Sequence, residues 1–222
     1  MSRLLHLEDR TGQISGDELA AVANALTIQA ADLARWWRHL PAAMITPAPE
    51  TPTSWPIRIV EKSSAGLGVH LDRHGHPYAE VTYGEGWTVT ASHEVCEMLV
   101  DPRGRRFDFG PTPDGRSGWV LIEVCDPVEA VEYYLDGVAL SDFCTPAWYG
   151  IGSADAADFR DAATPGQVLP LGYLSWIGWD RHWHQAFADA SGSVSVQRSQ
   201  REASMRGDLR AEKDRAFAAG DS

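Results

Sequence analysis

The first regular apolar pattern in the chain lies between residues 16 and 37. Alanine and leucine dominate this segment, and its apolar residues recur at helical spacing. Ser15 and Asp17 stand at its start, where side-chain oxygens can accept hydrogen bonds from the free N–H groups of a first helical turn. The pattern predicts one long amphipathic helix from Gly16 to Trp37.

Residues 41–56 interrupt this order, because five prolines fall within these sixteen residues. Proline fixes φ and lacks the N–H that helices and sheets require. We therefore predict an extended strap without regular structure, followed by a main domain that begins near Pro56.

Apolar runs predict the strands of that main domain. Residues 57–63 predict one strand, and residues 69–83 predict two, joined by a turn at residues 74–77. After a polar loop at residues 103–118, a continuous apolar run at residues 119–125 predicts a strand buried on both faces.

A helix is predicted from Trp87 to Val100. Glycines at positions 84 and 86 break the preceding strand. Asp101 and Pro102 end the helix, because proline cannot continue it and disfavours helical backbone at the residue before it.

The remainder of the chain predicts a hairpin and a charged tail. Residues 133–143 predict a hairpin that turns at Asp136–Gly137. Beyond Ser193, charges of both signs and few apolar residues predict a fraying helix that a partner chain would hold in order. These elements divide the chain into an N-terminal helix and strap at 1–55, a main domain at 56–192 and a charged helical tail at 193–222.

Composition and charge exclude several classes of function. With 222 residues, 44% of them hydrophobic, the chain is long enough for one substantial core. The formal net charge of −12 disfavours binding to nucleic acid or to an anionic membrane. No run approaches the roughly 20 apolar residues of a spanning helix. Three cysteines and no signal-peptide pattern favour cytoplasmic synthesis with reduced, buried thiols.

The predicted helix at residues 87–100 carries the candidate chemistry. One of its faces forms an apolar core stripe: Ala91, Val95, Met98 and Leu99. His93 and Glu97 are neighbours on the opposite face, among further apolar side chains. A buried carboxylate costs several kcal/mol unless it is paired. We therefore predict that both side chains bind one cation, as the two histidines of an HExxH zinc helix do.

Glu94 lies about 100° around the helix from His93. In HExxH enzymes this position holds the general base, which takes a proton from metal-bound water and passes it to the leaving amine. Here Glu97 replaces the second histidine, and an additional anionic ligand lowers the Lewis acidity of the metal.

A third ligand is predicted from Glu123 or Asp126. Glu123 lies in the predicted buried strand, where it either pairs with an arginine from residues 103–106 or completes the metal site. Asp126 precedes Pro127, and a carboxylate at such a bend can point back along the strand. In a third alternative, one of these two carboxylates binds the metal and the other orients His93.

Other potential ligands have simpler explanations. Cys96 and Cys125 lie beside proposed ligands, but their spacing is not that of a structural zinc site. Asp101 is expected to lie at the helix end or behind the ligands. Turn and packing roles are favoured for two histidine pairs, His74 with His76 and His182 with His184.

Three segments together carry a resemblance to a known family: SHEVCEMLVDP, EVCDPVE and LDGVALSDFCTPAWY. They resemble an uncharacterised family of bacterial and phage-encoded proteins with a His-Glu-x-x-Glu helix that ends in Asp-Pro, similar in this helix to zincin metallopeptidases. The likeness covers residues 56–176. It implies an α+β fold, with a zincin-like domain built of a small mixed sheet and a metal-site helix.

The leading hypothesis is a metal-dependent hydrolase of peptide or protein substrates, with Glu94 as base. Zinc is the expected metal, held by His93, Glu97 and Glu123 or Asp126, and Mn or Ca are alternatives because carboxylates favour harder ions. The other hypothesis is a non-catalytic structural or assembly protein, such as a phage virion component, with a zincin-like scaffold. On either hypothesis a protein partner or a second copy would contact the N- and C-terminal segments.

Overall fold

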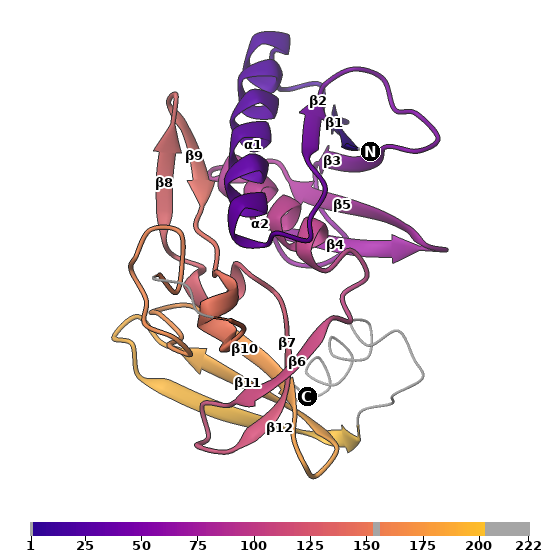
Figure 1. Ribbon diagram of the computed structural model, residues 1–222. Coiled ribbons are helices and arrows are strands. Elements are labelled where there is room, and N and C mark those ends of the chain that lie inside the picture. Colours follow the sequence, from indigo (N-terminus) through magenta and orange to yellow (C-terminus); the bar gives the residue numbers. More distant parts are fainter. Residues whose placement is uncertain (1, 153–155, 203–222) are drawn as a thin grey trace. The chain divides into compact units, whose positions relative to one another are not determined.

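The computed structural model describes residues 2–152 and 156–202. It divides into two compact units (Figure 1). The first comprises Met1–Pro102 and Glu132–Asp142, and the second comprises Arg103–Val131 and Phe143–Ser222. The predicted domain boundaries after residues 55 and 192 remain predictions.

A five-stranded mixed sheet underlies the first unit, in the order β2-β1-β3-β5-β4. The pairs β1–β2, β1–β3 and β3–β5 are parallel, and β4 runs antiparallel to β5. The strands are β1 (Arg3–Asp9), β2 (Ala43–Thr46), β3 (Trp55–Val60), β4 (Gly68–Arg73) and β5 (His76–Thr82). The strands predicted within residues 57–63 and 69–83 are confirmed.

The predicted amphipathic helix is confirmed as α1 (Gly16–Trp36). Ser15 caps it, since its Oγ accepts the N–H of Glu18 at 3.2 Å. The apolar face of α1 is buried and includes Val22, Leu26 and Leu33. This helix contacts β2 and the second helix of the unit.

The prediction that residues 41–56 lack regular structure is wrong in one part. Residues 43–46 form β2, a short edge strand paired in parallel with β1. Pro41 and Pro47 flank this strand instead of interrupting it, so its N–H groups remain available to the ladder. The number of prolines in the segment suggested that no strand could form there, although none of them lies within residues 43–46.

The second helix, α2 (Trp87–Val100), has the predicted bounds. It starts after Gly86, whose φ of 74° lies in the left-handed region that favours glycine. Every residue from Ala91 to Val100 is buried, so both helix faces are covered, as predicted. The predicted hairpin is also confirmed, as β8 (Glu132–Leu135) and β9 (Val138–Ser141), and β9 packs against α2.

The second unit contains a five-stranded antiparallel sheet in the order β12-β11-β10-β7-β6. Its strands are β6 (Phe107–Pro111), β7 (Ser117–Leu121), β10 (Tyr173–Ile177), β11 (His182–Ala188) and β12 (Val194–Glu202). Two short 3₁₀ helices connect them, η1 (Asp126–Val128) and η2 (Pro146–Tyr149).

Three sequence predictions need correction in this unit. The polar loop at 103–118 contains β6, because Phe107 and Phe109 alternate and pair with Leu121 and Trp119. The strand predicted at 119–125 ends at Leu121, so Glu123 follows the strand instead of lying within it. Residues 194–202 form a strand where the tail was predicted to be helical, and the rest of that tail lies outside the described residues.

The structure confirms an α+β fold, with two helices and several sheets among the described residues. None of the helices in residues 2–152 and 156–202 combines the length and the apolar character needed to cross a membrane.

Candidate metal centre

Helix α2 buries one histidine and two glutamates. His93, Glu94 and Glu97 are 9%, 4% and 1% exposed, and the predicted burial of His93 and Glu97 is therefore confirmed. A charged group at this depth requires an opposite charge or a metal.

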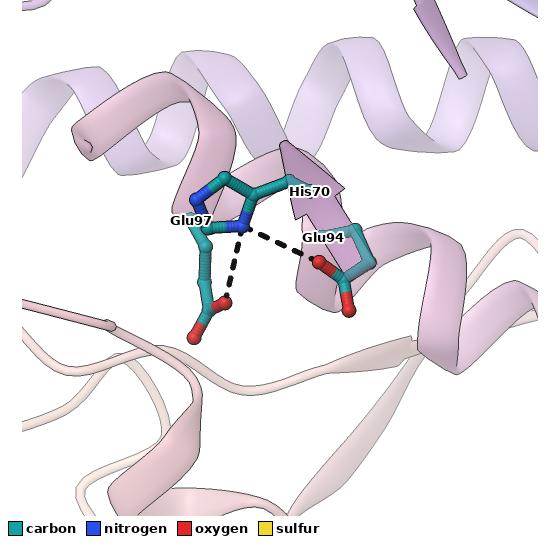
Figure 2. A group of neighbouring side chains, drawn as sticks. All are labelled: His70, Glu94 and Glu97. Atoms are coloured by element: carbon teal, nitrogen blue, oxygen red, sulfur yellow. Dashed lines mark hydrogen bonds and ion pairs between the residues drawn. The ribbon is translucent and has the colours of Figure 1, made fainter. Parts of the chain in front are cut away.

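His70 is a candidate ligand that the sequence patterns did not reveal. It lies on β4, is fully buried, and points its ring at α2 (Figure 2). Its Nδ1 is 3.3 Å from Oε2 of Glu94 and 3.5 Å from Oε2 of Glu97. One imidazole nitrogen therefore faces two buried carboxylates.

The other ring nitrogen of His70, Nε2, determines which protonation states the ring can adopt. Nε2 lies 3.1 Å from the backbone oxygen of Asp101, which can only accept, so Nε2 carries a proton. Nδ1 then either carries a second proton or offers its lone pair to a cation. Histidines that bind metals commonly donate their other N–H to a backbone carbonyl in this way. Asp101 lies at the end of α2, one of its two predicted positions, and its backbone oxygen holds the His70 ring.

The distances around His70 Nδ1 fit two ligands of one metal. Charge-assisted N–H···O bonds are typically about 2.7–2.9 Å long, whereas these contacts are 3.3 and 3.5 Å. Two ligands of a tetrahedral metal, each about 2.1 Å from it, lie about 3.4 Å apart. His70, Glu94 and Glu97 each offer one atom within 4.8 Å of the others, so these three side chains could hold one metal ion.

Glu97 also faces His93, through its other oxygen. Oε1 of Glu97 is 3.2 Å from Nε2 of His93, close enough for an ion pair. The contact lacks hydrogen-bond alignment, and this buried Oε1 accepts no hydrogen bond within the described residues. An orphaned buried oxygen of this kind favours a nearby cation.

The ionisation of Glu97 suits metal binding. Burial acts to raise its pKa, but the nearby imidazoles of His93 and His70 outweigh burial and hold this pKa well below its ordinary value. Glu97 is therefore ionised at neutral pH, which is the form in which a carboxylate binds a metal.

Gly68 allows β4 to approach Glu94 closely. A Cβ at this position would lie 2.5 Å from the Thr90 methyl group and 2.7 Å from Oε1 of Glu94. Both distances are shorter than real Cβ contacts, so any larger residue would displace the Glu94 carboxylate.

The predicted third ligands belong to the second unit. Glu123 and Asp126 are 3% and 2% exposed, and Asp126 opens η1 directly before Pro127. The hydroxyl of Tyr149 donates to the backbone oxygen of Glu123 at 2.8 Å, which fixes the main chain there. A role for either carboxylate in the metal site remains a prediction.

The cysteines and the other histidines have ordinary structural surroundings. All three cysteines are free and buried, and no cysteine joins a cluster of potential ligands in the part of the chain that the structure describes. His74 occupies a turn with a φ of 57°. His184 stacks on Trp176, with ring centroids 5.4 Å apart.

Comparison with known proteins yields no match. No family model, no curated protein and no solved structure matches the chain. The resemblance to zincin-like proteins therefore remains a prediction, and the functional argument depends on the geometry of the site.

Proposed function

We propose that this protein binds a divalent metal through α2 and β4 and is a metal-dependent hydrolase, most readily a zinc peptidase. The contact of His70 Nδ1 with Glu94 and Glu97, at distances that fit two ligands of one metal, carries this proposal. His93 and the unsatisfied Oε1 of Glu97 add a further donor pair on the same helix.

The residues divide into binding and acid–base roles. His70 and Glu97 hold the metal, and the Asp101 carbonyl keeps the His70 ring in the required tautomer. A bound zinc would supply Lewis acidity and an acidified water. Glu94 is placed either to complete the ligand set or to act as the general base that its position in the motif predicts.

Elemental analysis of the purified full-length protein, after equilibration with zinc and gel filtration, tests the binding step. We expect about one equivalent of metal in the wild type and less than about a tenth of that in His70→Ala. His76→Ala, a histidine variant at the start of β5, is the matched control and should retain the wild-type content. A metal-free wild type, or full loading of His70→Ala, would refute the site.

A peptide-library cleavage assay tests the hydrolase. Wild-type protein loaded with zinc should cleave a subset of peptides, and Glu94→Gln should lower the cleavage rate by at least about a hundredfold. Equal inertness of loaded wild type and Glu94→Gln would reject the enzyme while leaving the metal site intact.

The second candidate function is a structural or assembly protein that keeps a non-catalytic metal. One observation favours it: His70, Glu94, Glu97 and His93 are all at least nine-tenths buried, and structural zinc sites are closed whereas catalytic sites keep an open position. Metal binding without cleavage, accompanied by loss of folding on chelation, would support this function.

A further inference from the structure

Three large aromatic side chains lie exposed together on the second unit. Phe109, Trp119 and Trp179 are 42%, 47% and 76% exposed. The Phe109 ring lies 5.3 Å from that of Trp119 and 5.4 Å from that of Trp179, with interplanar angles of 64° and 74°. Single exposed apolar residues are ordinary, but a contiguous group of them marks a site of interaction.

These rings line a hollow of about 280 Å³ on one face of the sheet. Phe109 pairs with Trp119 across β6 and β7, and Trp119 pairs with Ile177 across β7 and β10. The side chains of Phe109, Trp119 and Ile177 therefore lie on the same face of the sheet. Among the described residues that line the hollow, Arg181 alone is charged. The volume is at the small end for ligand pockets and suits one or two rings.

The loop that carries Trp179 contains a non-glycine residue in a left-handed backbone conformation. The N–H of Gly178 donates to the His182 oxygen at 3.0 Å, and the N–H of Arg181 donates to the Gly178 oxygen at 2.9 Å. Residues 179–181 thus form a three-residue hairpin loop, whose last position favours glycine. Arg181 occupies that position with a φ of 61°. Such strained residues concentrate at binding sites, where the side chain is needed.

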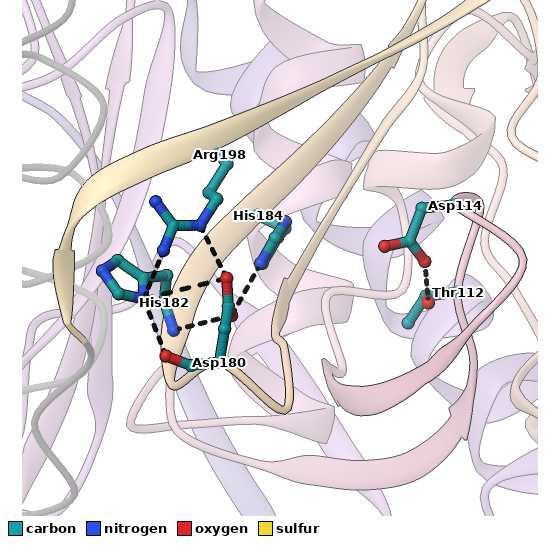
Figure 3. A network of polar contacts seen from close by, with 6 residues as sticks. All are labelled: Thr112, Asp114, Asp180, His182, His184 and Arg198. Carbon is teal, nitrogen blue, oxygen red and sulfur yellow. Dashed lines mark hydrogen bonds and ion pairs between the residues drawn. The ribbon is translucent and has the colours of Figure 1, made fainter.

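Asp180 of this loop contacts polar side chains of the adjoining strands β11 and β12 (Figure 3). Its Oδ2 accepts a hydrogen bond from Nε of Arg198 at 2.6 Å, and its Oδ1 lies 3.0 Å from Nε2 of His184. A loop that is already ordered loses little freedom when it binds a ligand.

We propose that this hollow is a binding site for a small molecule that joins an apolar ring to a carboxylate. The ring packs among Phe109, Trp119 and Trp179, and the carboxylate pairs with the guanidinium of Arg181. Because the chain carries a net charge of −12, an anion without a ring gains too little to bind. This proposal is independent of the metal site.

Titration of the full-length protein with three probes, followed by NMR of the tryptophan indole N–H groups, separates ring from charge. The probes are phenylacetate, phenylacetamide and acetate. We expect phenylacetate to shift the Trp179 signal and to bind about fivefold more tightly than phenylacetamide, with no binding of acetate. Equal affinity of the two ring compounds, or an unshifted Trp179 signal, would overturn the proposal.

Four variants assign these effects to residues. Trp179→Ala should remove binding of both ring compounds, and Arg181→Gln should make their affinities equal. Arg116→Gln, an exposed arginine of the same unit outside the hollow, should leave the fivefold preference unchanged. Arg181→Gly should abolish the preference while raising the melting temperature by about 2–4 °C, because glycine relieves the left-handed backbone. A preference that survives both Arg181 variants would contradict the role of this guanidinium.

Discussion

At the scale of single residues, Glu94 is where sequence and structure lead to different roles. The motif predicts a base, whereas Oε2 of Glu94 lies as close to His70 Nδ1 as a fellow ligand would. Glu94→Gln keeps the size of the side chain but removes its charge. We expect metal affinity, measured by competition with a chromogenic chelator, to fall by about 10- to 100-fold, as for loss of a close partner of the metal. Unchanged affinity with lost cleavage would restore the role of base.

Gly68 offers a test that substitutes none of the candidate ligands. Gly68→Ala puts a methyl group against the Glu94 carboxylate and the Thr90 methyl, so the carboxylate must move. We expect a metal affinity about tenfold lower in the same chelator competition. Gly84→Ala is the matched control, because a Cβ at position 84 meets no atom within 4 Å and the backbone there is not left-handed. Equal metal affinities of Gly68→Ala and Gly84→Ala would show that the close approach of β4 to Glu94 does not affect metal binding.

His70 explains why part of the site could not be predicted. In the segment from Val69 to Asp72, apolar and polar residues alternate, so His70 is expected on the solvated face of its strand. The structure buries both Val69 and His70, because α2 packs over β4. The local pattern gives no sign of that cover. By contrast, His93 and Glu97 were identifiable because apolar neighbours surround them within one helix.

At the scale of elements, the Asp180 network predicts how the β10–β11 hairpin responds to pH. Partial burial acts to raise the pKa of Asp180, but hydrogen bonds from Arg198 and His184 and the N–H of His182 hold it well below its ordinary value. The carboxylate therefore stabilises the fold at pH values above about 4, and this contribution is lost as pH falls through the folded-state pKa.

Asp180→Asn measures this contribution directly. Because the side chain is 37% exposed, solvent screening limits the expected loss of unfolding free energy to about 1 kcal/mol near pH 6. Urea unfolding should show a difference from wild type that shrinks below about pH 4. A difference that stays constant down to pH 3 would mean that the charge of Asp180 is not what stabilises the loop.

The sequence predicted elements whose ends are set by their own local residues. It did not predict short strands that depend on pairing with a distant strand. α2 has its predicted bounds because Gly86 directly precedes its first residue and Pro102 prevents it from continuing. β2 and β6 were missed because neither has a strong pattern of its own: four residues between prolines pair with β1, and five residues in a polar stretch pair with β7. Short strands are stabilised by their partners, which local sequence does not name.

At the scale of the whole molecule, the proposed metal and the proposed ring-binding hollow belong to different compact units. His70, Glu94 and Glu97 lie in the unit that contains α1 and the mixed sheet. Phe109, Trp119 and Trp179 lie in the unit built on the antiparallel sheet. A ligand that binds only folded protein stabilises it by mass action, and the effect is greatest in the elements that hold the ligand.

Metal removal should therefore affect the two units unequally. We expect treatment of the zinc-loaded protein with EDTA to speed amide hydrogen exchange in peptides from α2 and β4 by at least about tenfold, because a metal present at 100 times its Kd contributes about 2.7 kcal/mol. Peptides from β10 and β11 should exchange at unchanged rates, since no candidate ligand lies on those strands. His70→Ala, which lacks a ligand, should show no response to EDTA in either unit. Equal acceleration in both units would mean that they unfold as one cooperative body, and the metal would then stabilise the whole chain instead of one helix and its facing strand.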